Sequence, residues 1–195
     1  MKASIIIPTL NEEKALPECL KSLKAQSCRN FEIIVADGNS TDKTLEIARK
    51  AADKVVIEKK RTIAAGRQKG SSVAKGEILV FADADAVYPS DWLESILKPF
   101  KDERVVSVHG PVFLSDATFF EKILNVKLNF LFKLSNALGF PTGAGSNLAV
   151  RKTAFMKVEG FDVDLVTGED VLLQTKLKKV GESVFCDEAK TFVSA

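Results

Sequence analysis

The stretch GEILVFADADAVYPSDWL, residues 76–93, joins a strand signal to a pair of acidic side chains. The five apolar residues 78–82 predict a buried strand, and Asp83 and Asp85 follow it on either side of Ala84. Strand side chains alternate between faces, so this spacing predicts two carboxylates on one face, roughly 6.6 Å apart. At an effective dielectric of about 20, their repulsion is on the order of 2–3 kcal/mol, which a bound cation would remove.

Apolar runs upstream of this stretch alternate with segments of helical spacing. This alternation predicts an α/β fold with a Rossmann-like, mostly parallel sheet and helices on both faces. The second half is less regular, but it shows no repeat and no low-complexity linker, so we expect one domain over residues 1–195. The predicted strands are 4–7, 31–36, 55–57, 77–82, 105–112, 147–150, 184–185 and 191–193, and the predicted helices are 16–23, 41–52, 62–74, 119–138 and 171–179.

The composition narrows the classes of protein to consider. A net charge of +2, from 28 basic and 26 acidic residues, is too balanced to indicate nucleic-acid binding. The three cysteines form no metal-binding spacing, and their odd number favours reduced thiols and a cytoplasmic location. No uninterrupted apolar run has the length of about 18 residues that predicts a membrane span. The apolar run 5–7 is too short for a signal peptide.

Polar or acidic side chains follow the first, second and fourth predicted strands. Thr9, Asn11 and Glu12 follow the first strand, Asp37 follows the second, and the acidic pair follows the fourth. Turns alone favour Asp at such positions. In parallel sheets, however, ligands bind outside the carboxyl ends of the strands. The repeated placement therefore predicts a ligand site at this edge of the sheet.

The acidic pair suits a hard divalent cation with oxygen ligands, Mg²⁺ or Mn²⁺. Since Mg²⁺ usually combines one or two carboxylates with substrate phosphates, the pair favours a phosphorylated, nucleotide-type substrate. Arg61, Arg67 and Lys69 could neutralise phosphate charge, although each could equally lie on a solvated helix face. Asp37 can accept hydrogen bonds from a base or from a ribose hydroxyl.

Asp170 is the candidate general base, with Glu169 beside it in the first turn of a predicted helix. An acid at this position often serves only to stabilise the helix dipole. Its functional interpretation is to accept the proton of an acceptor hydroxyl. The spacing does not determine whether Asp170 faces the acidic pair, so both interpretations remain open.

Six short motifs occur in order along the chain, and together they are far more specific than any one of them. They are SIIIPTLNE (4–12), ADGNSTD (36–42), GRQKG (66–70), AKGE (74–77), DAD (83–85) and GED (168–170). With these motifs, the chain resembles family 2 glycosyltransferases of the GT-A fold over nearly its whole length. Two further segments, 146–151 and 160–162, fit the same family.

The resemblance implies transfer of a sugar from a nucleotide diphosphate-sugar with inversion at the anomeric carbon. It implies that residues 1–100 bind the donor, with UDP-sugars favoured over GDP-sugars, and that residues 101–195 bind the acceptor. Asp85 would coordinate Mn²⁺ or Mg²⁺, Asp83 would contact the ribose or the metal, and Asp170 would deprotonate the acceptor. The implied donor residues are Pro8, Thr9, Asn11, Glu12, Asp37, Arg61, Arg67, Asp83 and Ala84, and the implied acceptor residues are Gly143, Gly145 and Glu169.

Several positions depart from the family pattern. Gly38 stands where a second acid is usual, and Gln68 stands where asparagine is usual, although either amide can hydrogen-bond. His109, the only histidine, is a candidate metal ligand, but a histidine beside Gly110-Pro111 is more often structural. The chain ends at Ala195, before the region in which many members continue, so we expect either a minimal enzyme or part of a longer one.

The segment 118–140 predicts a helix that is apolar on most sides, with Lys122, Lys127 and Lys133 interspersed. Three interpretations remain open: core packing, a homodimer interface or a lipid-facing surface. The last would suit a lipid-linked acceptor at the cytoplasmic face of a membrane. Two other functions also remain, a non-catalytic scaffold that binds nucleotide sugars and a sugar-1-phosphate nucleotidyltransferase. The second is disfavoured because no Gly-rich, Arg-containing loop follows the first strand.

Overall fold

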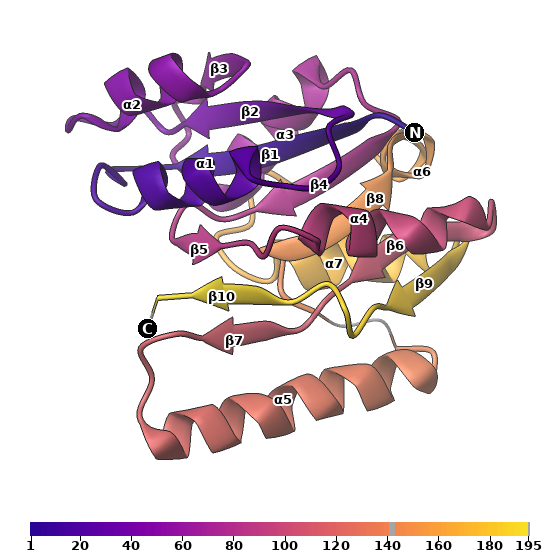
Figure 1. The fold of residues 1–195 in the computed structure, drawn as a ribbon. Coiled ribbons are helices and arrows are strands. Elements are labelled where there is room, and N and C mark those ends of the chain that lie inside the picture. The colour runs from indigo at the N-terminus through magenta and orange to yellow at the C-terminus, as the bar shows by residue number, and fades with distance from the viewer. Residues whose placement is uncertain (141–142, 195) are drawn as a thin grey trace.

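The computed structural model describes residues 1–140 and 143–194, apart from the side chain of Phe119. Its largest element is a seven-stranded sheet (Figure 1). The strands are β1 (Ala3–Thr9), β2 (Phe31–Asp37), β3 (Lys54–Ile57), β4 (Ile78–Ala82), β6 (Val105–His109), β8 (Asn147–Arg151) and β9 (Glu182–Phe185). They lie side by side in the order β3-β2-β1-β4-β8-β6-β9.

Helices cover both faces of this sheet, which confirms the predicted α/β class. β1 to β4 run parallel to one another, as do β6 and β9, whereas β8 runs antiparallel to both of its neighbours, β4 and β6. Strands of both halves of the chain therefore share one sheet. The helices are α1 (Leu16–Lys24), α2 (Thr44–Ala51), α3 (Ile63–Val73), α4 (Trp92–Leu97), η1 (Lys98–Lys101), α5 (Phe119–Ala137), α6 (Lys152–Lys157) and α7 (Glu169–Leu177).

Alternate residues of each strand pack into two cores, one on each face of the sheet. Ile5 and Ile7 of β1 pack with α1, α2 and α4, whereas Ile6 packs with α3, α6 and α7. Since both faces are covered, the central strands are apolar at nearly every position. Gly70 lets α3 lie close to β1, because a Cβ there would be 2.5 Å from Cγ2 of Ile6. The GRQKG motif thus has a packing role.

The predicted strand 105–112 is wrong, because this segment forms two strands in different sheets. β6 ends at His109, and β7 (Val112–Leu114) joins β5 (Ala86–Val87) and β10 (Thr191–Val193) in a three-stranded sheet. Pro111 lacks the N–H that a continuing ladder requires. Gly110 passes so close to the opposite loop that a Cβ there would be 2.0 Å from the carbonyl oxygen of Ala189. The sequence also did not predict α4, α6 and β5.

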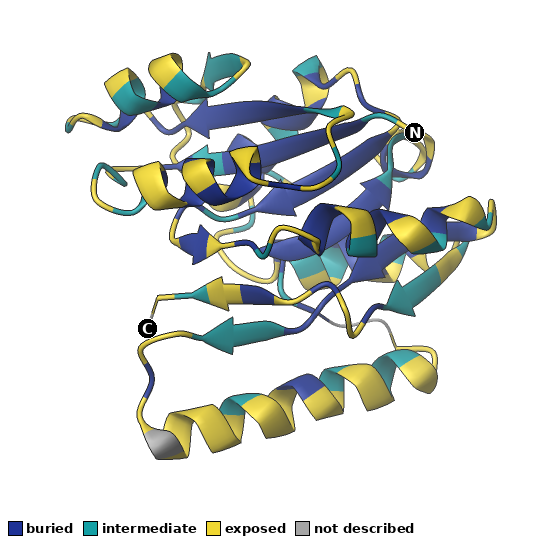
Figure 2. Cartoon of the chain, in the orientation of Figure 1, coloured by how far each residue is buried: buried dark blue, intermediate teal, exposed yellow. Residues whose placement is uncertain are grey.

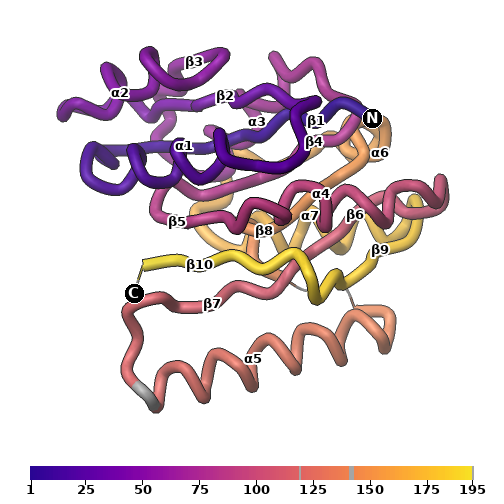
Figure 3. The backbone as a smooth tube through the Cα atoms, in the orientation of Figure 1, coloured from indigo at the N-terminus to yellow at the C-terminus, as the bar shows by residue number. Residues whose placement is uncertain are grey.

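Helix α5 packs against β7 and β9 at the periphery of the molecule, and Figure 3 traces the chain from β7 into it. Most of its described residues are exposed (Figure 2). Core packing, one of the three interpretations of the segment 118–140, is therefore wrong. Among the residues that the structure describes, no helix combines the length and the apolarity needed to cross a bilayer.

Candidate active site

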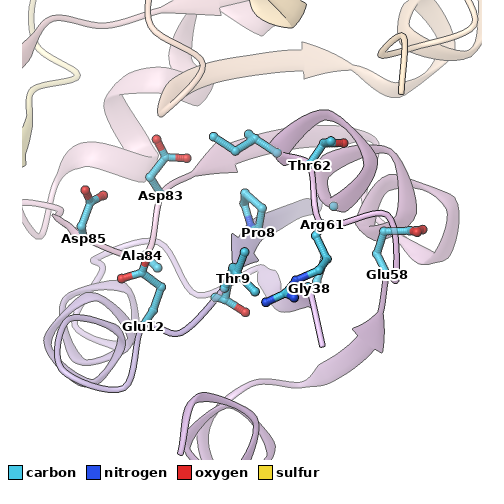
Figure 4. A pocket seen from close by; sticks show the side chains of 14 residues that line it. Pro8, Thr9, Glu12, Gly38, Glu58, Arg61, Thr62, Asp83, Ala84 and Asp85 are labelled. Atoms are coloured by element: carbon cyan, nitrogen blue, oxygen red, sulfur yellow. The ribbon is translucent and has the colours of Figure 1, made fainter. Parts of the chain in front are cut away.

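A cavity of about 340 Å³ opens where β1, β2 and β4 end, beside the start of α3 (Figure 4). Seven of the residues predicted to bind the donor or the metal line it together, although they come from two separate motifs and the loop before α3. They are Pro8, Thr9, Glu12, Arg61, Asp83, Ala84 and Asp85.

Seven further residues line this cavity that were not predicted as site residues from the sequence. Thr62 carried a local signal, since it is the N-cap of α3 and its side chain accepts a hydrogen bond from the amide of Ala65 at 3.2 Å. Four of the others belong to the six motifs, namely Leu10, Ala36, Gly38 and Gly66. Glu58 and Ile63 lie outside the motifs and carry no such signal. The unassigned residues are Leu10, Ala36, Gly38, Glu58, Thr62, Ile63 and Gly66.

Asp37, predicted to contact the base, is fully buried at the end of β2 and does not line the cavity. Its Oδ1 accepts a hydrogen bond from the amide of Ser40 at 2.9 Å. Its Oδ2 accepts from the hydroxyls of Thr9 at 3.0 Å and Ser40 at 2.7 Å. Asp37 therefore orients Thr9, which does line the cavity.

Asn11 and Glu12 tie the loop after β1 to the loop after β2. Asn11 has a positive φ of 59°, which asparagine tolerates better than most residues, and its Oδ1 accepts from the amide of Thr41 at 2.9 Å. The amide of Glu12 donates to Oγ1 of Thr44 at 2.7 Å. Asn11 thus acts as a brace outside the cavity, while the Glu12 side chain lines it.

The acidic pair lies in a turn and not in a continuing strand, because β4 ends at Ala82. Strand alternation therefore does not set the direction of these side chains, yet Asp83 and Asp85 both line the cavity. Reduced solvation, and then the negative charge of Asp83, raise the pKa of Asp85. Partial burial, followed by the charges of Asp85, Asp42 and Asp83, raises the pKa of Glu12. Negative charge accumulates on this side of the cavity.

Arg67 forms a buried bridge between the two halves of the chain. Its side chain is 3% exposed; Nη2 donates to Oδ1 of Asp83 at 2.8 Å, and Nη1 donates to Oε1 of Glu169 at 2.9 Å. Its guanidinium carbon lies 5.8 Å from the centre of the Phe161 ring. Arg67 does not line the 340 Å³ cavity, so in this structure it compensates carboxylates rather than facing that space.

The predicted catalytic and acceptor residues meet at the start of α7. Oδ2 of Asp170 accepts from the amide of Gly145 at 3.0 Å, and its Oδ1 accepts from the amide of Val171 at 2.8 Å. The carbonyl of Gly143 accepts from Nε2 of Gln174 at 3.0 Å. Glu169 connects this group to Asp83 through Arg67. None of the four predicted residues lines the 340 Å³ cavity.

His109 is fully buried in β6, and burial lowers its pKa to about 4. It does not line the cavity. A Cβ on Gly143 would lie 3.0 Å from Cβ of His109, so the imidazole packs against Gly143, one of the predicted acceptor residues. The neutral ring is part of the core beneath Gly143, as its position beside Gly110-Pro111 indicated.

Solved structures share the fold of this chain over nearly its whole length. A mannosyltransferase from Pyrobaculum calidifontis, solved with GDP-Man and Mn²⁺, matches 99% of this chain and 56% of its own with a TM-score of 0.82 and 23% identity. S. aureus TarS 1-349 in complex with UDP-GlcNAc matches 100% of this chain and 59% of its own, with a TM-score of 0.80 and 24% identity. The chain has the GT-A fold.

The family model described as Glycosyl transferase family 2 matches residues 4–159. The chain therefore belongs to glycosyltransferase family 2. A PGL/p-HBAD biosynthesis glycosyltransferase of Mycobacterium tuberculosis is 36% identical over 125 residues, covering 60% of this chain and 48% of the relative. A dolichyl N-acetyl-α-D-glucosaminyl phosphate 3-β-D-2,3-diacetamido-2,3-dideoxy-β-D-glucuronosyltransferase of Methanococcus voltae is 28% identical over 204 residues. The chain spans 48% and 63% of the length of these two relatives.

Proposed function

We propose that the chain transfers a sugar from a nucleotide diphosphate-sugar to an acceptor hydroxyl, with inversion at the anomeric carbon. The observation that carries the proposal is the convergence of Glu12, Asp83 and Asp85 on one cavity, which Arg67 and Glu169 connect to Asp170. A UDP-sugar is the favoured donor and a GDP-sugar the next. Family 2 membership supports this activity and gives the nucleotidyltransferase alternative no support.

The donor would occupy the 340 Å³ cavity. Figure 4 places Asp83, Asp85 and Glu12 on one side of it and Arg61 on the other. This separation suits a ligand that needs a cation near the acidic side and a positive side chain near its remaining anionic charge. The residues proposed to bind or to position the donor are Pro8, Thr9, Asn11, Glu12, Asp37, Arg61, Arg67, Asp83 and Ala84.

A divalent cation, Mn²⁺ or Mg²⁺, fits the acidic side of the cavity. Burial first, and neighbouring carboxylates next, raise the pKa values of Asp85 and Glu12, and the buried guanidinium of Arg67 contacts Asp83 and Glu169 instead. Asp85 and Asp83 would hold the ion; when bound, it would neutralise charge that develops on the leaving diphosphate. Among the described residues, no three metal-binding side chains form a complete site, so donor oxygens would supply the other ligands.

Asp170 is the proposed general base. Each of its carboxylate oxygens accepts one backbone hydrogen bond, which fixes the orientation of the group and leaves lone pairs for an incoming proton. An acceptor hydroxyl that lies against Gly143, Gly145 and Glu169 would transfer its proton to Asp170 as it attacks the anomeric carbon.

The proposed acceptor is a hydroxyl of a sugar or of a lipid-linked sugar at the cytoplasmic face of a membrane. The name of the Methanococcus voltae relative describes a lipid-phosphate-linked sugar, which supports the lipid-linked class. The three cysteines are unpaired, in keeping with a reducing compartment.

Thermal unfolding against UDP-, GDP-, CDP- and dTDP-sugars, with and without Mn²⁺, tests the donor site. A ligand at about one hundred times its dissociation constant adds roughly 2.7 kcal/mol to the free energy of unfolding. We expect a metal-dependent shift with one nucleotide, lost in Asp85→Asn and retained in Asp91→Asn, an exposed aspartate at the start of α4. No shift with any donor would contradict the proposal.

Asp170→Asn separates an enzyme from a scaffold that only binds nucleotide sugars. We expect turnover to fall about 10²–10⁴-fold, because general-base catalysis contributes a factor of that size. The donor-induced shift in unfolding should remain, since Asp170 does not line the donor cavity. A wild-type chain that binds its donor yet transfers no sugar to any lipid or sugar acceptor would favour the scaffold.

A further inference from the structure

Helix α5 turns its amide side chains toward the protein. Asn129 is 9% exposed, and its side chain pairs with the backbone of one residue of β7. Its Oδ1 accepts from the amide of Val112 at 3.1 Å, and its Nδ2 donates to the carbonyl of Val112 at 2.8 Å. Asn125 and Phe132, at helical spacing on either side of it, are half-buried. The face that packs is thus the more polar one.

The opposite face of α5 carries exposed apolar side chains. Leu124 is 67% exposed and Leu131 is 56% exposed, seven residues apart and therefore on one side of the helix. A contiguous apolar surface of this kind marks an interaction site. We call this the outward face of α5; it comprises Leu124, Leu128, Leu131 and Leu134.

We propose that the outward face of α5 docks on the surface of an anionic lipid bilayer, with the helix lying in the plane of the interface. Such helices bury an apolar face at the boundary of headgroups and acyl chains, and basic residues add attraction to anionic lipids. The charge of the outward face fits this partner, since its charged residue is the exposed Lys127. Lys122 is exposed on the side of the helix nearer β7, and Lys133 pairs with Asp187 on that side.

The position of Lys127 favours a bilayer over a second copy of the chain. It is exposed and lies three residues after Leu124 and four before Leu131, within the outward face. A two-fold interface would bury it at a high desolvation cost unless an acid paired with it. The acid of this helix, Glu121, already accepts hydrogen bonds from the amide and the hydroxyl of Thr118, both at 2.7 Å. At a bilayer, Lys127 extends its ammonium to the headgroups.

Both ends of α5 lead to the candidate active site. A second cavity, of about 450 Å³, is lined by Asp85 and by Ser115 and Asp116, which precede the N-cap Thr118. After α5, the chain returns to Gly145, whose amide donates to Asp170. Docking of α5 would therefore hold the candidate active site close to a bilayer that contains a lipid-linked acceptor. This link to the acceptor rests on the proposed function.

Flotation of the full chain with vesicles tests the docking surface. We expect binding to vesicles of phosphatidylcholine and phosphatidylglycerol, and a decrease of about tenfold or more in Leu124→Gln/Leu131→Gln, since each CH₂ removed from lipid costs a factor of about four. The matched control is Met156→Gln/Val166→Gln, two exposed apolar residues away from α5, which should bind like the wild type. Circular dichroism and thermal unfolding verify that each variant is folded.

Charge gives a second, independent test. Lys127→Gln should weaken binding to the anionic vesicles about fivefold, because one lysine near such a surface contributes a factor of that size. Binding to phosphatidylcholine alone should change little. The matched control Lys157→Gln alters an exposed lysine of α6 and should leave both affinities unchanged.

Three results would overturn the docking proposal: no binding to either vesicle type, equal binding by the double leucine variant, or a lipid-free dimer that this variant dissociates. The last result would assign the outward face to a second copy. Donor-induced stabilisation of the same variants separates this proposal from the enzymatic one. Donor binding without vesicle binding refutes the docking alone, and vesicle binding without any donor shift refutes the proposed function alone.

Discussion

Helices α1 and α5 are both amphipathic, but they turn opposite kinds of face to the protein. α1 buries Leu16, Leu20 and Leu23 against the sheet and exposes Lys21 and Lys24. α5 packs through asparagines against β7 and exposes its leucines. The periodicity of a helix therefore reveals two faces but does not reveal which of them meets the core. The surface that receives the helix decides, and β7 offers α5 unpaired backbone groups.

The largest difference should appear when one leucine is truncated in each helix. Leu20→Ala should lower the free energy of unfolding by about 2–5 kcal/mol, since it leaves a cavity in a packed core. Leu124→Ala should change it by less than about 0.5 kcal/mol, because its side chain is already exposed. Urea denaturation of both variants measures the contrast. A similar loss in the two would show that α5 buries its leucines in solution.

A second prediction concerns His109, a titratable side chain that is fully buried beside Gly143. Burial lowers its pKa from the usual 6.5 to about 4, so the folded state favours the neutral ring. Its contribution is complete above pH 6.5 and is lost as the pH falls through that window toward 4. It amounts to about 3 kcal/mol at most, at 1.36 kcal/mol per pKa unit. Unfolding measured between pH 7 and pH 4 should show a shallower decline in His109→Gln, and parallel curves would contradict the assignment.

The smallest expected effect concerns the asparagine contact beneath α5. Asn129→Ala should cost about 1–3 kcal/mol, because it removes the partner of the part-buried amide and carbonyl of Val112. Hydrogen exchange should accelerate at β7 and α5 and stay unchanged in β1 and β2. Asn30→Ala, which removes an exposed hydrogen bond to Met1, serves as the matched control. Uniform acceleration across the sheet would mean that α5 is not a separate unit.

The first half of the fold could be predicted from the sequence because its signals are local. β1, β2 and β4 are covered on both faces, so each contains an apolar run. The carboxyl ends of parallel strands meet at one edge, so the residues after β1 and β4 could be expected in one site without knowing any contact. Six of the seven predicted donor or metal residues that line the cavity do so for this reason, and Arg61 reaches it from the loop before α3.

The rest depends on contacts between residues far apart in the sequence. Nothing in residues 147–151 indicates that β8 runs antiparallel to β4. Arg67 carries a helix-surface pattern, but its environment is set by Asp83 and Glu169, which lie 16 and 102 residues away. The break at Gly110-Pro111 was visible as two turn-forming residues, yet the separate sheet that β7 joins is built by β10 from the end of the chain.

The pairing of β4 with β8 has a consequence for synthesis on the ribosome. β4 is entirely apolar and pairs on one side with β1, which is made before it, and on the other with β8, which ends about 70 residues later. At 5–20 residues per second, the nascent chain therefore presents a bare hydrophobic strand edge for about 4–14 s. Such edges recruit other chains into intermolecular sheets. Slow translation or truncation before residue 147 should thus favour aggregation or chaperone capture.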